Sequence, residues 1–140
     1  MTIVVDINPI AKGRPRFFRR GKHVGVITPG KTRAYENTLI DALKRANVKR
    51  PLSGPVSLNL TFYMPIPASR KRIKGIGSGA VPHSIKPDLD NLIKAATDAA
   101  NGILWEDDSQ IACVLAAKYY SDKPRIVYYI PEMAYEKEVK

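Results

Sequence analysis

The amino-acid sequence predicts a single α+β domain, with two main helices packed on a mixed β-sheet of about four strands. A chain of 140 residues is an ordinary length for one domain and is long enough to bury a core. Hydrophobic residues make up 44% of the chain and charged residues 26%, which is typical of a globular protein. We therefore expect one domain over residues 1–140, ending in a charged tail at about 132–140.

Four segments carry the signals of β-strands. Residues 2–7 alternate between apolar and other side chains, and residues 56–64 alternate over their whole length. Residues 111–120 and 125–130 are apolar and rich in β-forming residues, and the turn residues between them predict a direct connection. The single cysteine, Cys113, lies in the third of these segments, where we expect a buried core thiol.

Two segments have the period of amphipathic helices. The first begins after Pro29 and runs to about Asn47, and the second covers residues 88–103. Asp88 follows a proline and precedes the apolar period of the second helix, so it fits an N-cap. The two apolar stripes consist of Tyr35, Leu39, Leu43 and Ala46 in the first helix, and of Leu89, Leu92, Ile93, Ala96, Ala100 and Ile103 in the second.

Basic residues are concentrated in the N-terminal third of the chain and in a second long loop. Residues 11–50 contain twelve Lys or Arg against two acids, and residues 70–86 contain five against none, in a chain of net charge +10. A solvated surface would explain some of this charge, but its clustering indicates contact with nucleic acid. We expect residues 12–29 to form a loop that allows a short hairpin near His23–Ile27, and residues 65–86 to form a mobile flap. The expected DNA contacts in the two loops are Lys12, Arg14, Arg16, Arg19, Arg20, Lys22, Arg70, Lys71, Arg72 and Lys74.

Acidic residues are concentrated in one short segment. Residues 88–108 contain six acids and a single basic residue, Lys94. Asp88 and Asp90 open the second helix, and Asp107 and Asp108 precede the third strand, which we expect to bring them back to the first pair. Carboxylates without a Cys or His cluster favour Mg²⁺ or Mn²⁺.

Such a set of groups is suited to the hydrolysis of phosphodiesters. The metal ion can orient a water and polarise a phosphoryl oxygen, while Lys94 supplies positive charge to the transition state. Each group also has a structural explanation. Asp88 would cap the helix, Asp90 and Lys94 would form a surface ion pair, and Asp107 and Asp108 would be turn residues.

One block of the sequence has the form of a family signature. It combines D-L-D-N-L at 88–92 with Lys94, Asp98, Trp105 and D-D-S-Q-I at 107–111. In residue type, order and spacing the block resembles the RusA-type Holliday junction resolvases, which are small endodeoxyribonucleases of bacteria and phages. The segment G-R-P-R at 13–16 is similar to phage-type members, and the resemblance covers nearly the whole chain.

The resemblance implies a homodimeric, Mg²⁺-dependent enzyme, with Mn²⁺ as a substitute, that resolves four-way junctions in DNA recombination and repair. Its metal ligands would be Asp88, Asp90 and Asp108, with Asp107 in support, and its catalytic lysine would be Lys94. Many members carry a basic residue directly before the first aspartate, where this chain has a proline preceded by Lys86. We expect Lys86 to substitute for it, and Lys118 to be a further DNA contact.

Two other hypotheses remain open at this point. The chain could be a non-catalytic basic DNA- or RNA-binding protein whose acids are structural. A phosphotransferase with a DxD metal motif is disfavoured, because the motif here opens a helix and no Walker-type loop is present. No apolar run approaches the ~20 residues of a membrane span, and the N-terminus has the reverse order of a signal peptide. We therefore expect an intracellular protein with no membrane contact, and the resemblance implies a cytoplasmic protein of bacterial or prophage origin.

Overall fold

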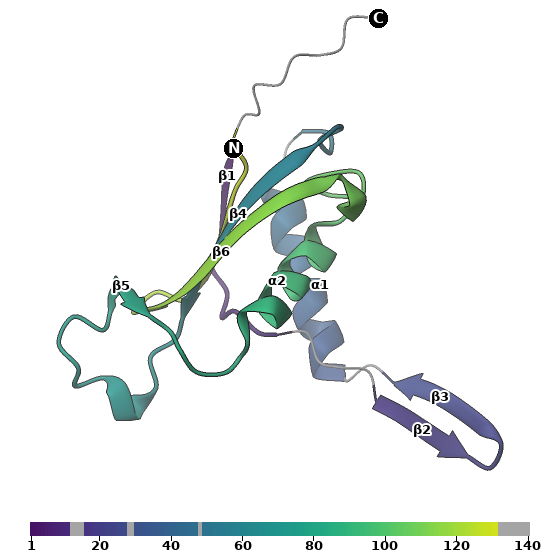
Figure 1. The fold of residues 1–140 in the computed structure, drawn as a ribbon, viewed down its shortest axis with the longest axis horizontal. Coiled ribbons are helices and arrows are strands. Elements are labelled where there is room, and N and C mark those ends of the chain that lie inside the picture. The colour runs from purple at the N-terminus through teal and green to yellow at the C-terminus, as the bar shows by residue number, and fades with distance from the viewer. Residues whose placement is uncertain (12–15, 28–29, 48, 132–140) are drawn as a thin grey trace, which may run out of the picture.

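The structure, a computed structural model, describes residues 1–11, 16–27, 30–47 and 49–131. A five-stranded sheet carries two helices on one face, and a two-stranded hairpin projects away from this body (Figure 1). The predicted α+β fold with a mixed sheet and two main helices is confirmed, with one strand more than expected. In the described ranges no helix is long and apolar enough to cross a membrane.

The sheet is mixed because one neighbouring pair of strands is parallel. Its strand order is β1-β7-β4-β6-β5, and β4 and β6 are parallel while the other pairs are antiparallel. A parallel pair needs a long crossover connection, which here contains α2. The five strands are β1 (Thr2–Val5), β4 (Val56–Met64), β5 (Ser78–Pro82), β6 (Ile111–Ser121) and β7 (Arg125–Tyr129).

The core lies between the helix-covered face of the sheet and the helices α1 (Gly30–Ala46) and α2 (Leu89–Ala100). Every second residue of β4 is buried, as the alternation predicts. Helix α2 ends three residues earlier than expected. Gly102 has a φ of 77°, which lies in the left-handed region, so the helix cannot extend through it. Tyr128 in β7 is fully buried and donates its hydroxyl to the Ala96 carbonyl oxygen at 2.9 Å, which ties the sheet to α2. Burial raises the pKa of this phenol.

The other face of the sheet is uncovered in the part of the chain that the structure describes. Val4, Leu115 and Tyr129 are exposed on three different strands. Cys113 is also exposed, so the prediction of a buried core thiol is wrong. The reason is its register, because Cys113 pairs with Ser57, whose side chain faces away from the helices.

The two basic loops are more structured than the sequence predicts. The hairpin comprises β2 (Arg16–Arg20) and β3 (His23–Ile27), so it begins seven residues before the expected one. The second loop, residues 65–86 and called the flap below, contains a 3₁₀ turn (η1, Ala68–Arg70) and the strand β5. Ile76 and His83 are buried, so the segment predicted as a long loop contains regular structure and two residues that pack against the body.

The Tyr128 hydroxyl offers a test of how the sheet and α2 are joined. We expect Tyr128→Phe to lower the free energy of unfolding by about 1 kcal/mol, because one buried hydrogen bond is lost while the ring stays. Urea unfolding followed by circular dichroism measures the loss. Tyr129→Phe, which changes the adjacent exposed ring, is the matched control and should have no effect. Equal effects of both substitutions would contradict the role of the Ala96 contact.

Candidate active site and DNA interface

Asp88 and Asp90 lie at the start of α2 with no structural task for their carboxylates. Asp88 has the extended backbone of an N-cap, with φ −65° and ψ 143°, but its side chain makes no capping hydrogen bond. Asp90 is exposed in the first turn, where the helix dipole favours a negative charge. Neither carboxylate has a hydrogen bond or ion pair within the described residues. The Asp88 carboxylate therefore does not cap the helix, and capping does not explain its presence.

Lys94 lies one turn further along α2. Its ammonium pairs with Asp98 Oδ2 at 3.6 Å. The expected ion pair between Asp90 and Lys94 is therefore not formed. The lysine side chain is 63% exposed, and an ion pair of this kind contributes little stability. Lys94 can therefore reach a ligand bound beside the first turn of α2.

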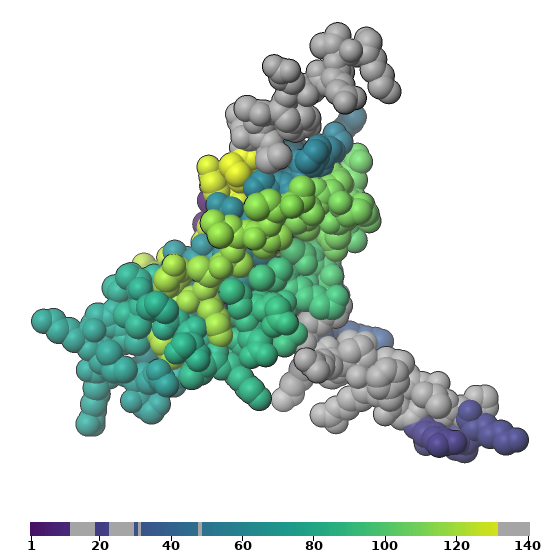
Figure 2. Space-filling model, viewed as in Figure 1, coloured from purple at the N-terminus to yellow at the C-terminus, as the bar shows by residue number. Residues whose placement is uncertain are grey.

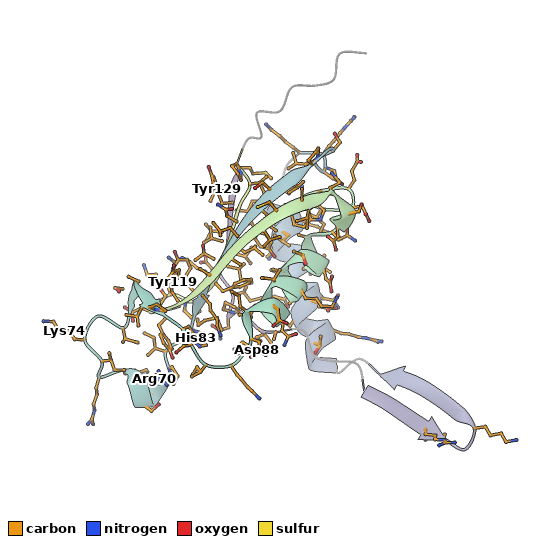
Figure 3. All side chains as sticks on the ribbon, in the orientation of Figure 1. Arg70, Lys74, His83, Asp88, Tyr119 and Tyr129 are labelled. Carbon is orange, nitrogen blue, oxygen red and sulfur yellow. The ribbon has the colours of Figure 1, made fainter. Side chains whose placement is uncertain are left out.

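A hollow in the surface adjoins Asp88. It is open to solvent and is lined by Lys86, Pro87, Asp88 and Asn91. Asn91 is three residues after Asp88, and this spacing places both side chains on one side of the helix start. Asn91 is not among the predicted site residues, although its i, i+3 spacing from Asp88 could have identified it. Figure 3 shows Asp88 and His83 at the end of the body from which the flap extends.

Asp107 and Asp108 lie beyond the other end of α2, in and beside the short turn η2 (Asp108–Gln110). Asp108 Oδ1 accepts a hydrogen bond of 2.7 Å from the indole Nε1 of Trp105, which is fully buried. Asp107 caps η2: its carboxylate accepts from the Ser109 amide at 3.0 Å, and Gln110 Oε1 accepts from the Asp107 amide. These hydrogen bonds to Ser109 lower the pKa of Asp107. Asp107 thus has a structural role, and Asp108 is held by Trp105.

The two acidic pairs do not meet within one chain. The 12 residues of α2 span about 18 Å and separate Asp88 from the turn that carries Asp108. Among the described residues, no three His, Cys, Asp or Glu side chains form a group that could hold a metal ion. The expectation that β6 returns the late carboxylates is wrong for a single chain, because Asp108 precedes β6 and stays at its beginning.

The residue that β6 does return to the start of α2 is Lys118. Its ammonium donates to the carbonyl oxygens of Ile85 and Pro87, both at 2.6 Å. It was predicted as a DNA contact, and the structure shows two of its three N–H donors directed at the backbone before Asp88.

The other residues that were predicted to contact DNA, where the structure describes them, lie on or next to the two projections. In the view of Figure 1, the flap and the hairpin extend on either side of the start of α2, and Figure 2 shows residues 19–22 standing clear of the body. Lys12 and Arg14 lie outside the described residues, and Arg16 begins β2. Lys86 is exposed beside the hollow. The other exposed basic residues of the projections are Arg19, Arg20, Lys22, Lys71, Arg72 and Lys74.

The flap is attached to the sheet by an aromatic cluster. Tyr120 is buried, with its ring centroid 4.7 Å from that of His83, and the Arg70 guanidinium lies 5.8 Å from the centre of the Tyr120 ring. Burial and the positive charge of Lys118 lower the pKa of His83, so it remains neutral at pH 7. Arg70 is therefore partly a structural residue, in addition to any contact with DNA.

Taken together, these features define a class of protein. Two carboxylates at a helix start without partners among the described residues, an exposed lysine one turn away and basic projections around them are typical of an enzyme that acts on a phosphodiester backbone. The comparisons with known proteins agree. The family profile "Endodeoxyribonuclease RusA" matches residues 6–130, and the chain belongs to this family.

The family assignment makes the chain an endodeoxyribonuclease, an enzyme that acts on DNA. Nucleases of this family are in general metal-dependent and act on branched DNA junctions. The chain is also 31% identical over 130 residues to the "Uncharacterized protein YqaN" of Bacillus subtilis (strain 168). That match covers 90% of this chain and 92% of the relative. The resemblance inferred from the D-L-D-N-L block is confirmed.

The cap formed by Asp107 has a defined pH dependence. Because its pKa is lower in the folded than in the unfolded state, its carboxylate stabilises the fold above its ordinary pKa of 3.8, and this contribution is lost as the pH falls. We expect Asp107→Ala to lower the urea midpoint at pH 7, and the difference from the wild type to narrow below pH 3.8. Asp6→Ala, at an exposed acid of the first connection, supplies the baseline. A difference that stays constant down to the lowest pH would contradict the assignment.

Proposed function

We propose that the protein is a Mg²⁺-dependent endodeoxyribonuclease that resolves Holliday junctions by paired symmetric nicks, in DNA recombination and repair. It would act as a homodimer in the cytoplasm of a bacterium, from a bacterial or prophage gene. The observation that carries the proposal is the start of α2, where Asp88 and Asp90 present carboxylates that neither cap the helix nor form ion pairs within the described residues.

The donor set fits a hard divalent cation. Asp88, Asp90 and Asp108 offer only oxygen ligands, and Mg²⁺ is usually bound by one or two carboxylates together with waters and substrate phosphates. When bound, Mg²⁺ supplies a polarised phosphoryl oxygen and a water of lowered pKa, and Mn²⁺ can replace it. The exposed ammonium of Lys94 would lie against the phosphate and balance the additional negative charge of the transition state.

The exposed basic residues of the hairpin and the flap would bind the arms of the junction. Arg19, Arg20 and Lys22 on the hairpin, and Lys71, Arg72 and Lys74 on the flap, can contact phosphates without reading base sequence. Lys86 lies between these groups and the carboxylates, at the rim of the hollow. Binding of this kind selects the shape of the DNA and weakens as the salt concentration rises.

A homodimer would explain why the carboxylates of one chain are apart. Residues 111–117 of β6 form an uncharged edge, because β5 pairs with β6 only from Tyr119 onward. This edge has neither the charges nor the prolines that usually protect an exposed strand. It lies next to the exposed side chain of Leu115 on the open face, in a chain of net charge +10, so it is the surface through which two copies would repel each other least.

Antiparallel pairing of two such edges about a two-fold axis would complete the site. It places the beginning of one β6 beside the end of the other. Asp108 immediately precedes β6, and Lys118, near its end, contacts the backbone before Asp88. Asp108 of one subunit would therefore join Asp88 and Asp90 of the second subunit, and two identical sites would face the two strands that are cut.

The catalytic proposal is tested on a synthetic four-way junction. We expect Asp88→Asn to reduce nicking by at least about 100-fold, because a metal ligand is lost, while junction binding in the absence of metal is retained. Gel assays of cleavage and binding measure both quantities. Asp41→Asn, at an exposed acid of α1, is the control and should cut normally. Normal nicking by Asp88→Asn, or no metal-dependent nicking by the wild type, would instead support a non-catalytic binding protein.

The shared site is tested by mixing inactive variants. Asp88→Asn and Asp108→Asn should each be inactive alone, but a mixture allowed to exchange subunits should regain nicking, because each mixed dimer contains one site with all carboxylates intact. A mixture of Asp88→Asn with Asp90→Asn is the matched control, since both of its sites carry a substitution. If the first mixture stays as inactive as this control, each chain must form its site alone.

A further inference from the structure

Lys118 occupies an unusual place for a lysine. In the parallel register of β4 and β6 it lies opposite Phe62, a fully buried residue on the face of the sheet that carries the helices. The side chain is half-buried and extends from the sheet toward the chain segment that leads into α2. Burying part of a lysine costs free energy unless its ammonium finds good acceptors, so a specific arrangement must hold it there.

The acceptors are two carbonyl oxygens that lie directly before Asp88. Lys118 Nζ donates to the Ile85 and Pro87 oxygens, each at 2.6 Å, and the Lys118 carbonyl accepts from the His83 amide at 3.0 Å. Hydrogen bonds from a charged donor are stronger than those between neutral groups. Three hydrogen bonds to one residue of β6 therefore fix the course of residues 83–87.

The position of Asp88 depends on this segment, because no contact of its own fixes its side chain. The carboxylate makes no capping hydrogen bond, and the backbone is held on the helix side by the bond from the Leu92 amide to the Asp88 carbonyl. On the other side, the nearest anchor is the bond from Lys118 to Pro87. The direction in which the Asp88 side chain leaves the backbone is thus set by α2 and by Lys118.

The charge of Lys118 also bears on the site. No carboxylate pairs with it in the part of the chain that the structure describes, and its neighbour His83 is neutral. Its ammonium therefore holds the segment before Asp88 through charge-assisted hydrogen bonds to the carbonyl oxygens of Ile85 and Pro87.

We propose that Lys118 is a positioning residue, which holds the backbone at Ile85 and Pro87 so that Asp88 points into the metal-binding site. The proposal rests on the proposed nuclease function for its kinetic consequence. Lys118 itself does not touch the DNA, which revises its expected role as a DNA contact. Misplacing a reacting group by about 1 Å is enough to reduce a rate by about 100-fold, so a residue of this kind can have a large effect.

The test substitutes Lys118→Met, which keeps the length of the side chain and removes the donor. We expect junction cleavage at saturating DNA to fall by about 10- to 100-fold and the Mn²⁺ affinity, measured by calorimetry without DNA, to fall by a similar factor. The Kd for the junction, measured without metal, should stay within about twofold, because no phosphate contact is lost. Lys118→Arg keeps the charge and can donate to both carbonyls, so it should restore most of the rate.

Hydrogen exchange separates this role from a general loss of stability. Amides of residues 85–92 should exchange faster in Lys118→Met, while those of β4 and β7 stay protected. Lys123→Met, at an exposed lysine in the turn after β6, is the control. It should change neither the exchange of residues 85–92 nor the protection of β4 and β7. If Lys118→Met does not fold, Lys118→Gln, which has a shorter neutral donor, replaces it. We then expect slower cleavage, weaker Mn²⁺ binding and faster exchange at residues 85–92 for Lys118→Gln as well.

Two results would overturn the proposal. A weaker, more salt-sensitive junction Kd with unchanged cleavage at saturation would make Lys118 a DNA contact. Unchanged exchange at residues 85–92 would show that other contacts hold the segment. If the wild type cuts no junction, the proposed function fails, but the exchange and Mn²⁺ measurements still decide the role of Lys118.

Discussion

The parallel pairing of β4 with β6 is the constraint on which the rest of the structure depends. Two parallel neighbours cannot be joined by a tight turn, so the chain must cross back over the sheet, and α2 is part of that crossover. The flap precedes α2 and the turn with Asp108 follows it. As a result, the crossover sets Asp88 at one end of α2 and Asp108 at the other, and β6 then returns along the sheet to bring Lys118 to the first end.

The regular elements of this arrangement could be predicted from periodicity. The alternation of residues 56–64 corresponds to a strand buried on one face, and the apolar stripe around Leu92 and Ala96 corresponds to the buried face of α2. β5 could not be predicted, because its Gly and Pro residues have poor strand propensity and it is held by only two register positions on β6. Cys113 shows the same limit. An apolar run does not reveal which of its two faces the helices cover.

The candidate site was predictable in its residue types but not in its geometry. The spacing of Asp88 and Asp90 showed that both would lie at a helix start, since this follows from local sequence alone. Whether Asp88 would cap the helix depends on a side-chain rotation that the sequence does not encode in any simple way. The separation of Asp108 from Asp88 is a property of topology, because it depends on which end of β6 adjoins which end of α2. The contact between Lys118 and Pro87 joins residues 31 positions apart and leaves no local pattern.

The hydrogen bond from Trp105 to Asp108 makes tryptophan fluorescence a reporter of the state of the Asp108 carboxylate. Trp105 is the sole tryptophan of the chain, and its buried indole donates to the carboxylate that we assign to the metal. Any cation or proton that binds Asp108 changes the electric field at the indole ring, and with it the tryptophan emission, which excitation beyond the absorption of the seven tyrosines isolates. Fluorescence can therefore follow occupancy of this carboxylate directly, in the absence of DNA and without any label attached to the chain.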